Sequence, residues 1–165
     1  MKNEKYLNLG CGIKKINGCI NIDCREECKP DLVYDIMKLP YEHKTIDGIY
    51  AIDVLEHISR DKVISTLKSW FYILKKKGYI ILRLPNIRNI ARRYLNGDID
   101  TNEFSRLIYG RQEQDQPENH HKSGFDIKTL KKILKKIGFK EIKEEFKGLI
   151  FIGCNNNNML LKFRR

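Results

Sequence analysis

The residues of this sequence that could do chemistry begin at a glycine turn between two short apolar runs. Residues 7–12 read Leu-Asn-Leu-Gly-Cys-Gly, and the second apolar run ends at Asp23, eleven residues after Gly12. Glycines let the backbone approach a ligand without a Cβ in the way. A carboxylate at the end of the next strand can accept hydrogen bonds from the two hydroxyls of a ribose. Gly10, Gly12 and Asp23 therefore predict a site for a nucleoside-containing cofactor.

The residues after the turn indicate which kind of nucleoside-containing cofactor could bind. A dinucleotide fingerprint needs a third glycine, for close packing of a helix that faces the pyrophosphate. Lys15 occupies that position here, so an NAD-dependent oxidoreductase is disfavoured. Glycine turns after strands are also common for purely structural reasons, and that alternative stays open on this motif alone.

Five further segments come after the glycine turn in a fixed order. Residues 35–40 read Asp-Ile-Met-Lys-Leu-Pro, residues 49–57 end in Val-Leu-Glu-His, and residues 74–82 contain three lysines before a glycine. Later, residues 109–112 read Tyr-Gly-Arg-Gln and residues 121–125 read His-Lys-Ser-Gly-Phe. In this order and spacing the chain resembles class I S-adenosylmethionine-dependent methyltransferases, and more closely a small methyltransferase type 11-like group. The resemblance covers most of the chain.

The resemblance implies an α/β fold with a doubly wound, Rossmann-like methyltransferase sheet, mostly parallel with an antiparallel last strand. It implies an enzyme whose cofactor is S-adenosylmethionine. The residues that would bind this cofactor are Leu9, Gly10, Cys11, Gly12, Asp23, Asp35, Ile36, Ile52 and Asp53. Of these, Asp23 would hold the ribose, Asp35 and Ile36 would border the adenine, and Asp53 would lie near the sulfonium. Asp35 could instead cap a turn, and Asp53 could cap the helix after it.

Methyl transfer is an in-line attack on a methyl group that the sulfonium already activates. The protein has to bring the two reactants together and exclude water. A general base is needed when the acceptor is a hydroxyl or a protonated amine, and histidine suits that task. The family positions favour His57 and His121 as the catalytic residues, with Tyr109, Gln112 and His120 binding the substrate. A structural helix histidine and a loop cap are the alternatives for His57 and His121.

The hydrophobic pattern predicts the elements that must position these residues. Strands are expected at residues 5–9, 19–23, 32–34, 48–52, 79–84, 140–146 and 159–163, and helices at about 61–77, 87–95, 104–109 and 126–137. Only nine residues, 10–18, join the first two strands. A parallel crossover normally takes a dozen or more, so the first crossover helix should be reduced or missing.

Size and composition indicate one domain. The 165 residues are 41% hydrophobic and 32% charged, which is typical of a single globular domain. That domain would span residues 1–165, with a helical and loop insertion at about 86–124. No apolar run reaches the ~18 residues of a membrane span, and we expect a cytoplasmic protein without a membrane partner. The five cysteines should be reduced. Cys24 and Cys28 fit no familiar zinc pattern, so no metal is expected.

The acceptor is less defined than the cofactor. The resemblance suggests a small molecule or a glycan. No Asn/Asp-Pro-Pro-Tyr stands after the fourth strand and no Pro-Cys pair is present, which disfavours methylation of DNA bases. A lid would come from residues 87–124 or from a second subunit, which makes a homodimer one expectation.

Two other functions stay open. The net charge of +11 would suit an RNA-directed methyltransferase, although a lysine-rich, Asn-rich composition also results from an AT-rich genome. The missing first helix, together with Lys76 and Lys77 where the family has Pro-Gly, would suit a catalytically inactive binding or accessory protein.

Overall fold

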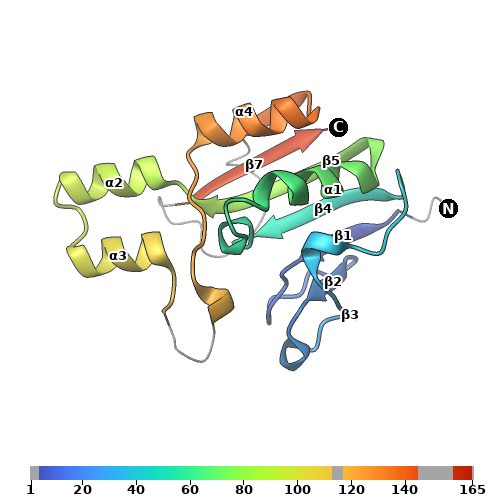
Figure 1. The fold of residues 1–165 in the computed structure, drawn as a ribbon, viewed down its shortest axis with the longest axis horizontal. Helices are drawn as coiled ribbons and strands as arrows, with labels where there is room; N and C mark the ends of the chain where they lie inside the picture. The colour runs from blue at the N-terminus through green and yellow to red at the C-terminus, as the bar shows by residue number, and fades with distance from the viewer. Residues whose placement is uncertain (1–3, 113–116, 145–157, 165) are drawn as a thin grey trace.

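The computed structural model describes residues 4–112, 117–144 and 158–164, and Figure 1 shows their arrangement around one central sheet. The strand order across the sheet is β3-β2-β1-β4-β5-β7-β6. The strands are β1 (Tyr6–Leu9), β2 (Ile20–Asp23), β3 (Leu32–Val33), β4 (Ile46–Ile52), β5 (Leu74–Pro85), β6 (Glu141–Glu144) and β7 (Asn158–Arg164). The helices are α1 (Val63–Ile73), α2 (Ile87–Leu95), α3 (Thr101–Tyr109) and α4 (Ile127–Ile137), with 3₁₀ turns η1 (Glu26–Cys28), η2 (Ile36–Lys38), η3 (Leu55–His57) and η4 (Pro117–Asn119).

The first five strands are parallel and reverse their order between β1 and β4. This is the strand order of a doubly wound α/β sheet, whose ligands bind outside the carboxyl ends of the strands at the reversal point. The predicted fold class is therefore confirmed. On the other side of β5, β7 pairs antiparallel with both β5 and β6. Residues 145 and 146 of the predicted strand 140–146 lie outside the described part of the chain.

The predicted loss of the first crossover helix is also confirmed, since residues 10–19 contain only turns. Two buried amides hold this short connection in place. Asn8 Nδ2 donates to Lys14 O at 3.1 Å and to Asn21 Oδ1 at 2.9 Å, and the same Oδ1 accepts from Ile16 N at 2.8 Å. Asn21 Nδ2 in turn donates to Asp31 Oδ2 at 2.7 Å. Side-chain hydrogen bonds thus satisfy the loop's backbone groups where a helix would have satisfied its own.

Replacing Asn21 with alanine is expected to lower the free energy of unfolding by about 2–4 kcal/mol. The change removes the acceptor that Asn8 Nδ2 and Ile16 N share, and each buried polar group that loses its partner costs about 1–3 kcal/mol. Urea denaturation measures the loss. Asn96→Ala is the matched control, because Asn96 is exposed, and equal stabilities of the two variants would contradict the prediction.

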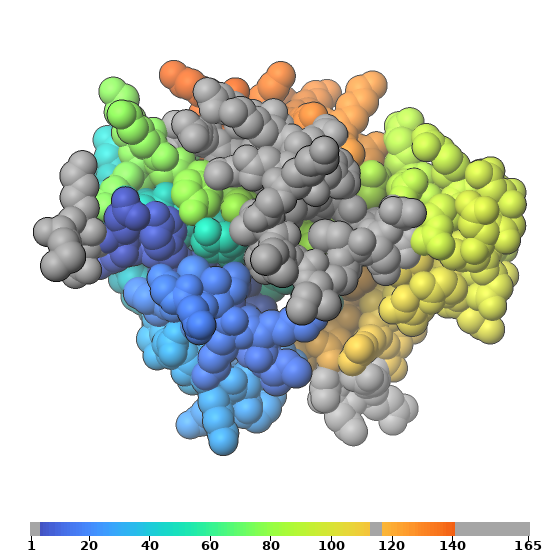
Figure 2. All heavy atoms as spheres, turned by 180° about the vertical axis from the view of Figure 1, so that it is seen from behind, coloured from blue at the N-terminus to red at the C-terminus, as the bar shows by residue number. Residues whose placement is uncertain are grey.

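The apolar core lies between the sheet and the two helices α1 and α4, which pack against each other on one face (Figure 1). Trp70 of α1 is fully buried, and its indole Nε1 donates to Ile36 O at 2.8 Å, which ties α1 to η2. The cluster around it is apolar throughout, with Leu7, Ile49, Leu82 and Leu134 fully buried. Figure 2 shows the molecule from the opposite side, with the N-terminal residues (blue) toward one end and α2 (yellow-green) at the other.

The predicted end of the helix at about residue 77 was wrong. The helix α1 ends at Ile73, and Leu74 begins β5 by pairing with Ile46. A Cβ at Gly78 would lie 2.9 Å from Lys75 O and 3.1 Å from Ile46 O. Gly78 is therefore required by close backbone approach within the sheet rather than by a helix cap.

The segment predicted to be an insertion, residues 86–124, follows β5 in the sequence and precedes α4. Its described residues, 86–112 and 117–124, lie beyond the carboxyl ends of the strands (Figure 1). The helices α2 and α3 pack on each other, and Tyr94 and Phe104 meet with ring centroids 4.6 Å apart. The chain then returns through η4 to η3, where Lys122 N donates to Glu56 O at 2.8 Å. This return brings residues 117–123 to the strand ends at which ligands of such sheets bind. In the described part of the chain, no helix has the length and apolar character of a membrane span.

Candidate active site

A pocket of about 350 Å³ lies at the reversal point between β1 and β4. It is of the size typical of small-molecule sites. Its wall comes from the carboxyl ends of β1, β2 and β4, from η2 and η3, and from the returning insertion. The lining residues are Gly10, Asp23, Cys24, Arg25, Asp35, Ile36, Met37, Asp53, Val54, His57, Ile58, Ser59, Lys62, Glu118, Asn119 and Lys122.

Asp23 is the buried acid of this pocket, with only 3% of its surface exposed. Its Oδ2 accepts from Gly12 N at 2.7 Å, and its Oδ1 accepts from Arg25 N at 3.0 Å and Arg25 Nε at 3.2 Å. Burial alone would raise the pKa of Asp23, but the hydrogen bonds from Arg25 and Gly12 hold that pKa below its usual range. The carboxylate is thus ionised at neutral pH, as an acceptor of hydrogen bonds from ribose hydroxyls must be.

The glycine turn lies directly against the wall of the pocket. Gly10 has φ +60° and Gly12 has φ +50°, and residues other than glycine rarely adopt this backbone conformation. A Cβ at Gly10 would lie 2.1 Å from Val54 Cγ2. The turn therefore needs Gly10 both for its backbone angles and for its contact with η3.

The turn at residues 35–38 forms a second wall. Asp35 Oδ1 accepts from Met37 N at 2.8 Å, so this carboxylate caps η2 while it also lines the pocket. Ile36 and Met37 add apolar surface beside it. Asp35 can therefore cap the turn, which was the alternative, and also line the pocket in which the adenine was predicted to bind.

Asp53 does not cap the helix after it. Its carboxylate pairs with Arg83, whose Nε donates to Oδ1 at 3.0 Å and whose Nη2 bonds to Oδ2. Arg83 is 5% exposed, and its buried guanidinium needs this partner. The capping alternative is therefore wrong, because the residue at the N-cap of η3 is Val54 and no side chain caps this turn.

A second pocket of about 410 Å³ adjoins the first. Three residues, Asp53, His57 and Asn119, line both pockets. The rest of its wall contains three basic residues, Lys14, Arg106 and Arg111, together with Glu56, Pro85, Leu107, Gly110 and His121. The two cavities thus meet at the ends of β4 and η3.

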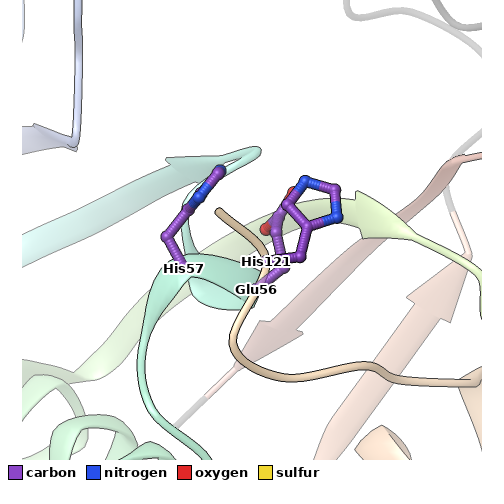
Figure 3. Close-up of side chains that lie close together, drawn as sticks. All are labelled: Glu56, His57 and His121. Carbon is purple, nitrogen blue, oxygen red and sulfur yellow. The ribbon is translucent and has the colours of Figure 1, made fainter. Parts of the chain in front are cut away.

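Glu56, His57 and His121 gather at this junction, and Figure 3 shows their side chains close together. The two imidazole rings meet edge to face with centroids 5.0 Å apart. His57 Nδ1 lies 3.1 Å from His120 O, so the tautomer with a proton on Nδ1 donates there and leaves Nε2 as an acceptor.

Burial sets the protonation of these three groups. It lowers the pKa of His57, and the neighbouring His121 lowers it further. It also lowers the pKa of His121, while the nearby carbonyls of Ile108 and Leu107 act in the opposite direction. Burial raises the pKa of Glu56 to about 8, and Asp53 adds to this rise. Both imidazoles are therefore neutral at physiological pH, which leaves each with a free lone pair.

The structure brings most of the predicted cofactor residues together. Gly10, Asp23, Asp35, Ile36 and Asp53 line the first pocket. Four other predicted cofactor residues are not among those that line it: Leu9, Cys11, Gly12 and Ile52. Leu9 is fully buried in the core.

The predicted acceptor residues are more scattered. His57 lines both pockets and His121 the second. Tyr109 and Gln112 lie instead along a shallow hollow with Ser105 and Arg106. His120 lines none of these cavities with its side chain, and it reaches the junction only through its backbone oxygen.

Sequence reasoning missed three charged residues of the site. Arg25 holds Asp23, Arg83 holds Asp53, and Glu56 lies buried between the two histidines and β5. Arg83 carried a signal, since it is the single charge in the apolar run at residues 80–84. A lone charge at the carboxyl end of a buried strand needs a buried partner.

The sheet order, the glycine turn and the buried acid after β2 define a class of nucleoside-cofactor proteins. Residues 2–144 match the family model described as a methyltransferase domain, and the chain belongs to that family. The chain is a methyltransferase whose cofactor is S-adenosylmethionine. No curated protein matches the sequence.

Solved structures share the fold. A SAM-dependent methyltransferase from Archaeoglobus fulgidus is 18% identical with a TM-score of 0.68, and the match covers 98% of this chain and 86% of that one. One from Mesorhizobium loti is 16% identical with a TM-score of 0.62, covering 98% and 90%. Phosphoethanolamine N-methyltransferase 2 from Haemonchus contortus, in complex with S-adenosyl-L-methionine, is 13% identical with a TM-score of 0.58, covering 86% of this chain and 34% of that one.

The residues of the first pocket fit S-adenosylmethionine. An ionised buried acid stands at the end of β2, an apolar turn comes after β3, and a glycine turn lies against the pocket wall. The sulfonium of the cofactor supplies the activated methyl group. What such a transfer requires of the chain itself is to bind the cofactor, to exclude water and to orient an acceptor.

Proposed function

We propose that the chain transfers the methyl group of S-adenosylmethionine to a small-molecule or glycan acceptor bound in the second pocket. The observation that carries the proposal is the shared wall of the two pockets at Asp53, His57 and Asn119. A cofactor in the first pocket and an acceptor in the second would meet at that wall, which is the arrangement that an in-line transfer requires. We also propose that the protein acts in the cytoplasm. That it forms a homodimer stays a prediction.

His57 and His121 are the proposed catalytic residues. Each would hold the acceptor hydroxyl or amine through a ring nitrogen, because both rings are neutral, His57 lines both pockets and His121 lines the second. Lys14 and Arg111 in the second pocket favour an acceptor that also carries a phosphate or a carboxylate. Nucleotide-linked sugars and acidic oligosaccharides have both features. We propose that Tyr109 and Gln112, in the adjoining hollow, contact the more distant part of such an acceptor.

The assay for this function measures S-adenosylhomocysteine formed from S-adenosylmethionine in the presence of single acceptors. The panel contains nucleotide-linked sugars, neutral and acidic oligosaccharides, RNA and a peptide. Turnover with an anionic sugar acceptor supports the proposal. Turnover with RNA alone, with an affinity that falls steeply as salt rises, supports the RNA-directed alternative. Cofactor binding without turnover on any acceptor supports the inactive binding protein.

Replacing His121 with alanine is expected to reduce kcat/KM for the acceptor by about 100-fold and to leave the affinity for S-adenosylmethionine unchanged. His121 lines only the second pocket, and misplacing a reacting atom by about 1 Å can cost ~100-fold in rate. Steady-state kinetics and cofactor titration measure the two effects. His43→Ala is the control, since His43 stacks on Tyr72 away from both pockets. A loss of cofactor affinity equal to the loss of kcat/KM would contradict the assignment.

A further inference from the structure

The cluster at the junction of the pockets has the composition of a metal site. Glu56, His57 and His121 each offer one ligand atom, and these atoms all lie within 4.8 Å of one another. Two imidazole nitrogens and one carboxylate oxygen form a common ligand set for catalytic zinc and for other divalent transition metals. Figure 3 shows the three side chains converging from η3 and from the returning insertion.

The Glu56 carboxylate provides an independent observation. Glu56 is 2% exposed, and its Oε2 has no hydrogen-bond partner among the described residues. A buried polar atom without a partner costs free energy. A cation between Glu56 and the histidines would supply the missing partner.

One of the two histidines, His57, is already oriented for this role. A metal-binding histidine usually donates its other ring N–H to a backbone carbonyl or a carboxylate, which fixes the ring and its tautomer. His57 Nδ1 lies 3.1 Å from His120 O, so its Nε2 is the nitrogen that can bind a metal. Four-coordinate zinc holds its ligand atoms about 3.3 Å apart. Small rotations of the three side chains would bring their ligand atoms to that separation.

We propose that Glu56, His57 and His121 bind one divalent transition-metal ion, with an open coordination position toward the second pocket. Three protein ligands and an open position are the arrangement of catalytic rather than structural metal sites. With the metal bound, an oxygen or nitrogen of the acceptor would bind at that position instead of at the ring nitrogens of His57 and His121. Metal binding itself does not depend on the proposed acceptor, and it departs from the expectation drawn from the sequence.

The experiment removes metal from the purified chain with a chelator and then titrates it with Zn²⁺ and with Co²⁺. We expect one equivalent of each ion to bind. Zn²⁺ at ~100 times its Kd should raise Tm by roughly 5–11 °C. The absorption spectrum of bound Co²⁺ should lack a thiolate band, which separates this site from binding at the four described cysteines.

The variants identify the ligands. Glu56→Gln keeps the shape of the side chain and is expected to lower metal affinity by at least about 100-fold, as is His121→Ala. His43→Ala should bind metal like the unmodified chain. Affinity for S-adenosylmethionine should be the same before and after metal removal, so a failure of metal binding is distinguishable from a failure of the cofactor site. Weak binding with no defined stoichiometry, or equal affinity in Glu56→Gln and the unmodified chain, would overturn the proposal.

Discussion

Replacing Asp23 with alanine is expected to weaken S-adenosylmethionine binding by about 100-fold to 10,000-fold. The buried, ionised carboxylate would accept hydrogen bonds from two ribose hydroxyls. Hydrogen bonds to a charged group contribute about 1.5–3 kcal/mol each, and every 1.4 kcal/mol is about tenfold in affinity. The change also releases Gly12 N and Arg25, which the same carboxylate holds in place. Isothermal titration calorimetry with the cofactor measures the loss.

The control for Asp23 is Asp98, an exposed acid that lines none of the three pockets. Asp98→Ala should change cofactor affinity by less than about threefold, as is typical of a surface substitution. Thermal unfolding of each variant without ligand separates loss of binding from loss of fold. If folded Asp23→Ala binds the cofactor within about threefold of the unmodified chain, the ribose does not bind at Asp23.

Replacing Gly10 with alanine is expected to lower the free energy of unfolding by about 2–6 kcal/mol. A non-glycine residue at φ +60° costs of order 1–3 kcal/mol. The added methyl group would lie 2.1 Å from Val54 Cγ2, and such overpacking typically costs a further 1–3 kcal/mol. Because Val54 also lines the cofactor pocket, the shift that relieves the contact should weaken cofactor binding as well.

Two comparisons separate the backbone effect from the steric one. Gly97 has φ +78°, and nothing lies within 4 Å of a Cβ placed there, so Gly97→Ala should show the backbone cost alone. In a double-mutant cycle, Val54→Ala should recover part of the loss at Gly10, with a coupling of about 1–3 kcal/mol. Urea denaturation of the single and double variants measures both quantities. Equal losses in Gly10→Ala and Gly97→Ala would show that the contact with Val54 is relieved at no cost.

The parts of the fold that depend on local sequence could be predicted well. The glycine turn, the nine-residue connection and the helix at 127–137 can be read from residue types and spacing over a dozen positions. The helix α4 begins where Asp126 accepts from Thr129 N and ends at Gly138, as its caps indicate. The end of α1 was missed because strand pairing of Leu74 with Ile46 overrode a local helical pattern.

The candidate active site, like the fold, could be predicted in part from local sequence. The sequence by itself determined which strand ends carry the glycine turn and Asp23, since a parallel sheet brings successive carboxyl ends to one edge. Only the tertiary structure decided that Arg83 pairs with Asp53, that Arg25 holds Asp23, and that Glu56 is buried beside His121. These contacts join residues on different elements. Their partners are chosen by burial, because a charge removed from water must find an opposite charge, a hydrogen bond or a metal wherever the fold brings one near.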